Sequence, residues 1–192
     1  AGMLLSPTWS SIRNGKMLPT LLRPPMQPTP TPSATELIVL CGLSGAGKTV
    51  AIRALEDAGY YCIDHLPTAV LLPTLAVLQS QGVARIAIGL EMSDPEFVRS
   101  AQSHWDDLVT QGFSIRAVVL TCRADVLMRR YHETRRPHPL SKMGLSTESA
   151  IAMETRALRS LPRGIHMVDT SEMTALILTK WMQQYIDESH QG

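Results

Sequence analysis

The stretch Leu40-Cys41-Gly42-Leu43-Ser44-Gly45-Ala46-Gly47-Lys48-Thr49, LCGLSGAGKT, decides the fold. Its spacing matches the phosphate-loop pattern G-x-x-x-x-G-K-[ST]. Glycine allows positive φ and a close approach of the backbone to a ligand, and successive N–H groups then form an anion-binding concavity. The pattern predicts that the loop amides from Gly42 to Thr49 bind phosphate groups. It also predicts that Lys48 reaches the β- and γ-phosphates and that the Thr49 hydroxyl binds Mg²⁺.

The segments on either side of this loop fit the same interpretation. Residues 36–41 form a short apolar run that is typical of a buried parallel strand. Residues 50–58 carry apolar side chains at helical spacing and are followed by Gly59. A phosphate loop requires a strand before it and a helix after it, whose N-terminus also favours phosphate. The context therefore favours a phosphate site over a chance glycine-rich turn.

Composition places the chain among ordinary globular proteins. It has 192 residues, of which 44% are hydrophobic, and a formal net charge of +1. The near-neutral charge gives no overall attraction to nucleic acid or membranes, and the apolar runs are far shorter than a membrane span. Cys41, Cys62 and Cys122 are an odd number without a C-x-x-C pattern, which predicts reduced thiols in a cytoplasmic protein.

Residues 1–35 are expected to lie outside the folded domain. Prolines crowd this segment, as in RPPMQPTPTPSAT, and it lacks hydrophobic periodicity. We therefore predict a disordered, proline-rich extension over residues 1–35 and one nucleotide-binding domain over residues 36–190. No long apolar region precedes a cleavage site, so secretion is not expected.

From residue 36 onward, strand and helix patterns alternate, which indicates an α/β fold. Further strands are predicted at residues 60–63, 85–90, 115–120 and 165–169. Helices are predicted at residues 67–81, 94–110, 124–131 and 146–161, with a last helix capped by Thr170 or Ser171 and a loop at 132–145. The pattern predicts a kinase-like P-loop NTPase fold, a five-stranded parallel sheet with helices on both faces.

Two acidic residues follow predicted strands, Asp64 in YYCIDHLP and Glu91 in RIAIGLEMSD. Ligands of open α/β sheets bind at the carboxyl ends of the strands, so both carboxylates are candidates for Mg²⁺ binding beside the phosphate loop. Glu91 fits if its strand neighbours the strand before the loop. Asp64 fits if the site reaches one strand further, or as a base toward a second substrate. The alternative for both is a surface turn.

A cationic segment, RRYHETRRPHPLSKMG, occupies residues 129–144. Phosphoryl transfer needs cations that neutralise developing charge, and a mobile arginine loop is a common source of them. Arg135 and Arg136 are the candidates, since a guanidinium group binds phosphate in a bidentate manner. Contact with RNA and a solvated basic surface are the alternatives. Tyr131 is the only aromatic residue there for base stacking.

These motifs together resemble one family. GLSGAGKTVAIRALEDAGYYCIDHLP, RRYHETRRPHPLS, LSTESAIAMETRALRSL and DTSEM are similar to the N-terminal nucleotide-binding domain of the RapZ/YvcJ family, the bacterial RNase adapter proteins. The resemblance covers residues 37–186. It implies a P-loop fold, binding of ATP and GTP, and weak nucleotide hydrolysis.

The resemblance also implies roles for residues outside the loop. A second nucleotide-contacting segment of the family corresponds to Glu91 and Asp94, although Glu91 stands where the family has aspartate and Ser93 where it has arginine. Family members carry a further C-terminal domain, to which RNA and protein binding are chiefly ascribed. This chain stops at Gly192, so RNA and protein partners are expected through that other domain.

Three hypotheses follow from the sequence. The first is a Mg²⁺-dependent ATP- or GTP-binding domain with slow hydrolysis, in which Lys48, Asp64, Arg135 and Arg136 act on the phosphates, as part of an adapter-type regulator of small RNA decay. The second is a small-molecule kinase with the same loop and arginine segment. The third is a regulatory module in which nucleotide tunes RNA or protein contacts.

Overall fold

The structure is a computed structural model that describes residues 12–13, 16–17, 34–91, 95–161 and 165–189. The chain divides into two compact units, residues 1–33 and 34–192. In the first unit, β1 (Ile12–Arg13) and β2 (Lys16–Met17) form a short antiparallel pair.

Five parallel strands form the sheet of the second unit. They are β3 (Thr35–Gly42), β4 (Tyr61–Ile63), β5 (Arg85–Gly89), β6 (Phe113–Thr121) and β7 (His166–Asp169). Their order across the sheet is β4-β5-β3-β6-β7. The predicted α/β fold with a five-stranded parallel sheet is confirmed. The phosphate loop follows the central strand, β3, and β5 lies next to it, the condition that the sequence interpretation set for Glu91.

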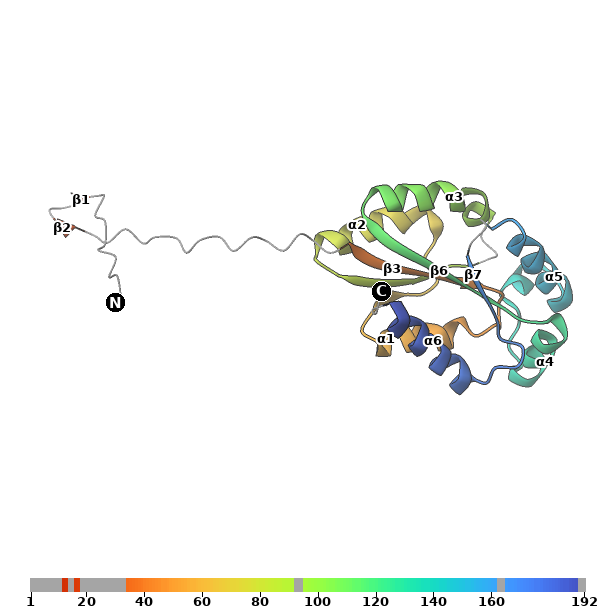
Figure 1. Cartoon of the computed structure of the whole chain (residues 1–192). Coiled ribbons are helices and arrows are strands. Elements are labelled where there is room, and N and C mark those ends of the chain that lie inside the picture. The colour runs from red at the N-terminus through yellow and green to blue at the C-terminus, as the bar shows by residue number, and fades with distance from the viewer. Residues whose placement is uncertain (1–11, 14–15, 18–33, 92–94, 162–164, 190–192) are drawn as a thin grey trace. The chain divides into compact units, whose positions relative to one another are not determined.

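Helices connect the strands. They are α1 (Lys48–Asp57), the short 3₁₀ helix η1 (Thr68–Val70), α2 (Leu71–Ser80), α3 (Pro95–Thr110), α4 (Ala124–Thr134), the 3₁₀ helix η2 (Pro139–Met143), α5 (Thr147–Leu158) and α6 (Ala175–Ser189). In Figure 1, α2 and α3 lie on one face of the sheet and α1 and α6 on the other. Helices α4 and α5 pack against each other near the carboxyl end of β6 (Figure 1).

The side chains of β3 alternate between the two faces of the sheet and so contribute to the core on both sides. Leu37 and Val39 point to the face covered by α2 and α3, where Leu75 and Leu108 are buried against them. Ile38 points to the other face, which α1 and α6 cover. Since helices cover both faces of a parallel sheet, its central strand is apolar throughout, which explains the continuous hydrophobic run in the sequence.

Two parts of the secondary-structure prediction were wrong. The predicted loop at 132–145 contains the last turn of α4 and the 3₁₀ helix η2. The last helix is not capped by Thr170 or Ser171, because α6 begins at Ala175 and the Thr174 hydroxyl accepts a hydrogen bond from the Ile177 amide at 3.2 Å. The Thr170 hydroxyl donates instead to the main-chain carbonyl of Ala46 at 2.8 Å, a tertiary contact that local pattern does not reveal.

The three cysteines are unpaired, in agreement with the prediction of free thiols. Burial raises the pKa of Cys41 and of Cys62 to about 12, although Lys48 opposes the shift at Cys41. Both thiols therefore stay protonated at neutral pH. Since the thiolate is the nucleophilic form, neither is poised for covalent catalysis.

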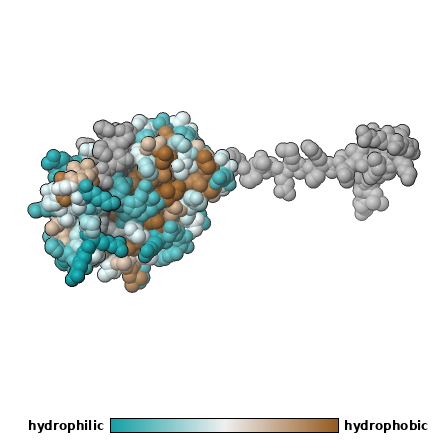
Figure 2. Space-filling view, turned by 180° about the vertical axis from the view of Figure 1, so that it is seen from behind, coloured by the Kyte–Doolittle hydropathy of each residue, from teal (hydrophilic) through white to brown (hydrophobic). Residues whose placement is uncertain are grey.

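The surface combines hydrophilic and hydrophobic residues. Seen from the side opposite to Figure 1, hydrophobic residues form a limited band bordered by hydrophilic ones (Figure 2). The most exposed large apolar side chains of the described residues include Met143 and Leu176. None of the helices in the described part of the chain is long and apolar enough to cross a membrane.

Candidate functional site

The loop between β3 and α1 presents free main-chain amides. Gly45 and Gly47 have φ angles of 85° and 108°, in the left-handed region, and Gly47 caps the N-terminus of α1. Within the described residues, the amides of Gly45, Gly47, Lys48 and Thr49 have no hydrogen-bond acceptor. Because these N–H groups gather at a helix N-terminus, they form the kind of concavity that binds phosphate.

Several carbonyl groups of the same loop are held by the surrounding structure. The Arg130 guanidinium donates to the Gly45 carbonyl at 3.1 Å, and Thr170 donates to that of Ala46. The Lys48 ammonium donates to the Gly42 carbonyl at 2.9 Å. C=O and the following N–H point in opposite directions across a trans peptide. Because the Ala46 carbonyl points toward Thr170, the N–H of Gly47 points away from Thr170. These contacts pre-organise the loop.

A cavity of about 630 Å³ opens in front of the loop. Six loop residues line it: Ser44, Gly45, Ala46, Gly47, Lys48 and Thr49. Of the other predicted site residues, Asp64, Glu91 and Arg136 line the cavity, whereas Gly42, Leu43 and Arg135 do not. Asp94 lies outside the described residues. The structure thus brings the loop, both strand-end acids and one of the two predicted arginines to a single cavity.

Arg135 ends helix α4 in a left-handed conformation, with φ of 51°. Its neighbour Arg136 lines the cavity together with Pro137 and Pro139. A left-handed residue reverses the direction of the chain, so consecutive side chains point differently. Of the two arginines predicted from the sequence, Arg136 lines the cavity and Arg135 does not.

His65 connects the two acids at the strand ends. Its Nδ1 lies 3.2 Å from Asp64 Oδ2 and its Nε2 lies 3.3 Å from Glu91 Oε1. His65 has a φ of 56°, which is unusual for a residue other than glycine and is found more often at functional sites. Asp64 also depends on Gly89, where an added Cβ would lie 2.3 Å from Asp64 Oδ1. Sequence analysis did not single out His65.

The oxygen atoms at this end of the cavity suit a magnesium ion. Glu91 Oε2 is buried and has no hydrogen-bond partner within the described residues. Glu91, Asp64 and Thr49 offer carboxylate and hydroxyl oxygens, the ligands that Mg²⁺ prefers. In the part of the chain that the structure describes, no three His, Cys, Asp or Glu side chains form a metal-binding group. The residues present fit an ion that takes its remaining ligands from phosphate and water.

Arg130 is a site residue that sequence analysis missed. It lies one turn before the end of α4, half-buried, and donates to the Thr170 carbonyl at 2.8 Å as well as to Gly45. It therefore fixes the phosphate loop to the segment that precedes α6. The only sequence signal was its place in the cationic stretch.

Replacing Arg130 by methionine should weaken binding of phosphate-containing ligands about ten-fold, because the Gly45 carbonyl loses the charged donor that holds it. Arg129→Met is the matched control, since Arg129 is exposed on the same helix and pairs with Glu133 at 3.9 Å. The measurement is a calorimetric titration of both variants with pyrophosphate and with Mg²⁺–ATP. Equal affinities of the two variants would contradict the role of Arg130.

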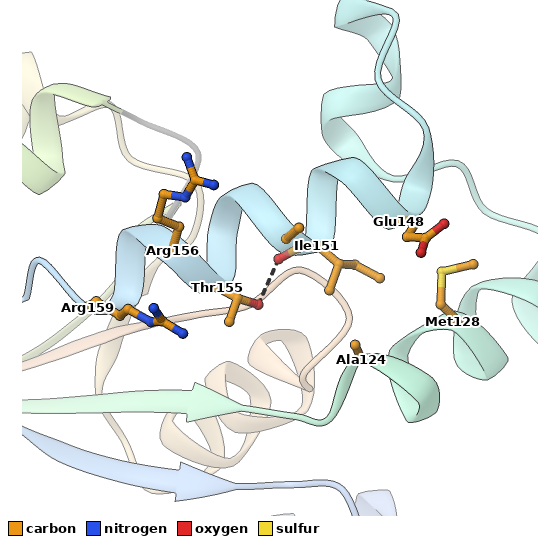
Figure 3. Close-up of a pocket in the computed structure, with 8 residues that line it drawn as sticks. Ala124, Met128, Glu148, Ile151, Thr155, Arg156 and Arg159 are labelled. Atoms are coloured by element: carbon orange, nitrogen blue, oxygen red, sulfur yellow. Dashed lines mark hydrogen bonds between the residues drawn. The ribbon is translucent and has the colours of Figure 1, made fainter.

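A second cavity of about 440 Å³ lies between α4 and α5 (Figure 3). Arg156 lines it from α5 and Arg159 from the position just after that helix, and the Thr155 hydroxyl donates to the Ile151 carbonyl within α5. Ala124 and Met128 line it from α4. It shares no lining residue with the cavity at the phosphate loop.

Comparison with known proteins agrees with this geometry. The RapZ-like N-terminal domain family matches residues 35–189. A nucleotide-binding protein of Chromobacterium violaceum is 37% identical over 151 residues, which cover 79% of this chain and 54% of that protein. One from Dechloromonas aromatica is 36% identical over 158 residues, covering 82% and 56%. The chain thus spans about half the length of the curated relatives it matches.

Among solved structures, the YorR protein of Bacillus subtilis, in complex with phosphorylated GDP, has the same fold. It superposes with a TM-score of 0.55 at 14% identity, covering 81% of this chain and 98% of that one. At this identity the likeness concerns the fold alone. With the phosphate loop, the strand order and the family match over residues 35–189 all in agreement, the chain belongs to the RapZ-like N-terminal domain family.

Proposed function

We propose that this domain binds ATP or GTP together with Mg²⁺ and hydrolyses the nucleotide slowly. The observation that carries the proposal concerns four residues that line the cavity, Gly45, Gly47, Lys48 and Thr49. Their amides have no hydrogen-bond acceptor among the described residues. The names of the curated relatives, nucleotide-binding proteins, support it. A phosphate loop binds phosphates and does not read the base, so both nucleotides are proposed ligands.

The polar and charged groups around the loop have distinct tasks in this proposal. The loop amides and Lys48 bind the phosphates, while Thr49, Glu91 and Asp64 hold Mg²⁺, which neutralises phosphate charge. Arg130 uses its guanidinium group on main-chain carbonyls, which leaves Arg136 to stabilise the transferred phosphoryl group. Asp64 orients the attacking water. The segment with Met173, Thr174 and Leu178, which lines the cavity beside Gly47, receives the base.

A second candidate is a small-molecule kinase. The cavity extends past the loop to Asp64 and His65, whose carboxylate and imidazole lie 3.2 Å apart. An acceptor hydroxyl bound there would meet a carboxylate within reach of the phosphate site, as phosphoryl transfer to a metabolite requires. Transfer of labelled phosphate to compounds of a metabolite library, without water-dependent release, would favour this candidate over slow hydrolysis.

The wider role belongs to the whole protein. We place the domain in the cytoplasm, as part of an RNase adapter-type regulator of small RNA decay. The chain spans about half the length of its curated relatives. We propose that RNA and protein partners bind chiefly outside this domain. A regulatory module in which nucleotide tunes those contacts is compatible with slow turnover. Salt-dependent RNA binding by this chain, lost on changing Arg135 and Arg136, would place RNA contact in this domain instead.

The proposal is tested by calorimetric titration with non-hydrolysable ATP and GTP analogues, each with Mg²⁺. We expect a micromolar dissociation constant for at least one analogue, which corresponds to a binding free energy of about −8 kcal/mol. The ratio of the dissociation constants of the two analogues gives the base preference. Phosphate release from ATP and GTP is then measured under single-turnover conditions. Absence of binding by both analogues at millimolar concentration would contradict the proposal.

A further inference from the structure

A buried carboxylate lies directly behind the phosphate loop. Glu154, in the middle of α5, is 1% exposed. Its Oε2 accepts a hydrogen bond from the Ser44 amide at 2.8 Å and its Oε1 accepts one from the Ser44 hydroxyl at 2.7 Å. Burying a carboxylate is costly unless its oxygens are bonded, so this two-point contact holds Ser44 firmly to α5.

The same carboxylate faces His138, which is 1% exposed. His138 Nε2 lies 3.5 Å from Glu154 Oε2. The Leu140 amide donates to His138 Nδ1 at 3.2 Å, so Nδ1 carries no hydrogen and the neutral ring bears it on Nε2, on the side of Glu154. Within the described residues, Nε2 has no hydrogen-bond partner. The ring hydrogen on Nε2 therefore lies on the side of the Glu154 carboxylate, 3.5 Å from Oε2.

Glu154 thus joins two parts of the cavity wall that are far apart in the sequence. Ser44 belongs to the phosphate loop, and His138 stands between Arg136 and Pro139, both of which line the cavity. Tyr131 packs on the His138 ring with centroids 5.2 Å apart. Burial raises the pKa of Tyr131 to about 12, with Glu154 adding to the shift, so its hydroxyl stays neutral beside this carboxylate.

This arrangement determines which loop amides face a ligand. The Ser44 amide is occupied by Glu154, whereas the amides of Gly45, Gly47, Lys48 and Thr49 have no acceptor in the part of the chain that the structure describes. Fixing Ser44 also fixes the direction of the peptide that leads to Gly45. We infer that Glu154 is a positioning residue of the nucleotide site, which holds the phosphate loop and the Arg136 segment in one arrangement through Ser44 and His138. The inference rests on the proposed function, since it concerns the same cavity.

Two variants of Glu154 separate positioning from charge. In Glu154→Gln, the amide oxygen still accepts from the Ser44 N–H while the NH₂ group donates to the Ser44 oxygen, so both contacts persist. Glu154→Ala removes them. We expect alanine to weaken binding of a Mg²⁺–ATP analogue about ten-fold and glutamine to stay within about three-fold of the wild type. Met153→Ala, at an exposed neighbour on α5, is the matched control.

Hydrogen exchange in the nucleotide-free protein provides a readout that general destabilisation does not reproduce. In Glu154→Ala, peptides covering residues 43–49 and 136–141 should exchange faster than in the wild type, while peptides of β6 should exchange at the wild-type rate. In Met153→Ala, all of these peptides should exchange at the wild-type rate. If Glu154→Ala does not fold, His138→Ala replaces it, with faster exchange expected at 136–141 and analogue binding weakened about three-fold.

The outcomes distinguish this inference from the proposed function. A wild-type protein that binds neither analogue overturns the proposed function, while exchange still tests the link between Ser44 and His138. A wild-type protein that binds, together with unchanged affinity in Glu154→Ala, overturns the positioning role. The role is also overturned if hydrogen exchange in Glu154→Ala speeds up in β6 as much as in the phosphate loop. It is overturned as well if Glu154→Gln binds the analogue as weakly as Glu154→Ala does.

Discussion

Replacing Lys48 by methionine is expected to lower the affinity for Mg²⁺–ATP and Mg²⁺–GTP analogues at least about 100-fold while the domain stays folded. The ammonium group is the only cation of the loop itself, and Lys48 lines the same cavity as Gly47 and Thr49. It donates to the carbonyls of Gly42 and Leu43, at 2.9 and 3.4 Å. Methionine keeps the apolar stem and removes the charge, and charge-assisted contacts to phosphate are among the stronger ones in proteins.

Lys180→Met is the control for this experiment. Lys180 is exposed on α6 and is absent from the cavity lining, so the change removes the same charge away from the site. Lys180→Met should unfold within a few degrees of the wild type. Lys48→Met should unfold at a lower temperature but stay folded at 25 °C, because the Gly42 carbonyl loses a charged donor. Binding of the analogues by Lys48→Met with wild-type affinity would place the nucleotide somewhere other than the phosphate loop.

Replacing Gly42 by alanine is expected to lower the free energy of unfolding by at least about 4 kcal/mol. Gly42 has a φ of 140°, and an added Cβ would lie 2.1 Å from the Leu120 carbonyl oxygen and 2.7 Å from its nitrogen. Both are main-chain atoms of β6, which pairs with β3 at this position. The side chain therefore cannot fit unless the two central strands separate. Domains of this size are stable by only about 5–15 kcal/mol.

Gly82→Ala is the control that separates the steric clash at Gly42 from the backbone strain of a positive φ. Gly82 also has positive φ, 77°, but an added Cβ would meet nothing within 4 Å. We expect this control to cost only about 1 kcal/mol. The measurement is urea denaturation of both variants at 25 °C. Equal losses of stability would show that β6 does not approach Gly42 so closely.

The elements that could be predicted are those whose signals are local. The strand over 36–41, the loop and the helix that follows form one continuous pattern, and the structure places β3 and α1 there. Asp64 and Glu91 were found because parallel strands bring their carboxyl ends to one edge. Their arrival at the same cavity depended on strand order, which the sequence left open and the structure supplies.

The residues that were missed hold the loop from distant parts of the chain. Arg130, Thr170 and Glu154 contact Gly45, Ala46 and Ser44, across 85, 124 and 110 positions respectively. Such partners carry no motif, because any side chain that the fold delivers to the right place can serve. The predicted helix over 124–131 already contained Arg130. Helical periodicity, however, does not show that its guanidinium group reaches the carbonyls of Gly45 and Thr170.

The most direct test of the account follows individual backbone amides by ¹⁵N NMR while a Mg²⁺–ATP or Mg²⁺–GTP analogue is added to the labelled chain. The account predicts large shifts at Gly45, Gly47, Lys48 and Thr49, the amides without an acceptor among the described residues. Ser44 should shift less, because Glu154 occupies its amide. Saturable binding with shifts confined to residues away from this loop, or no shifts with either analogue, would contradict a phosphate site at the end of β3.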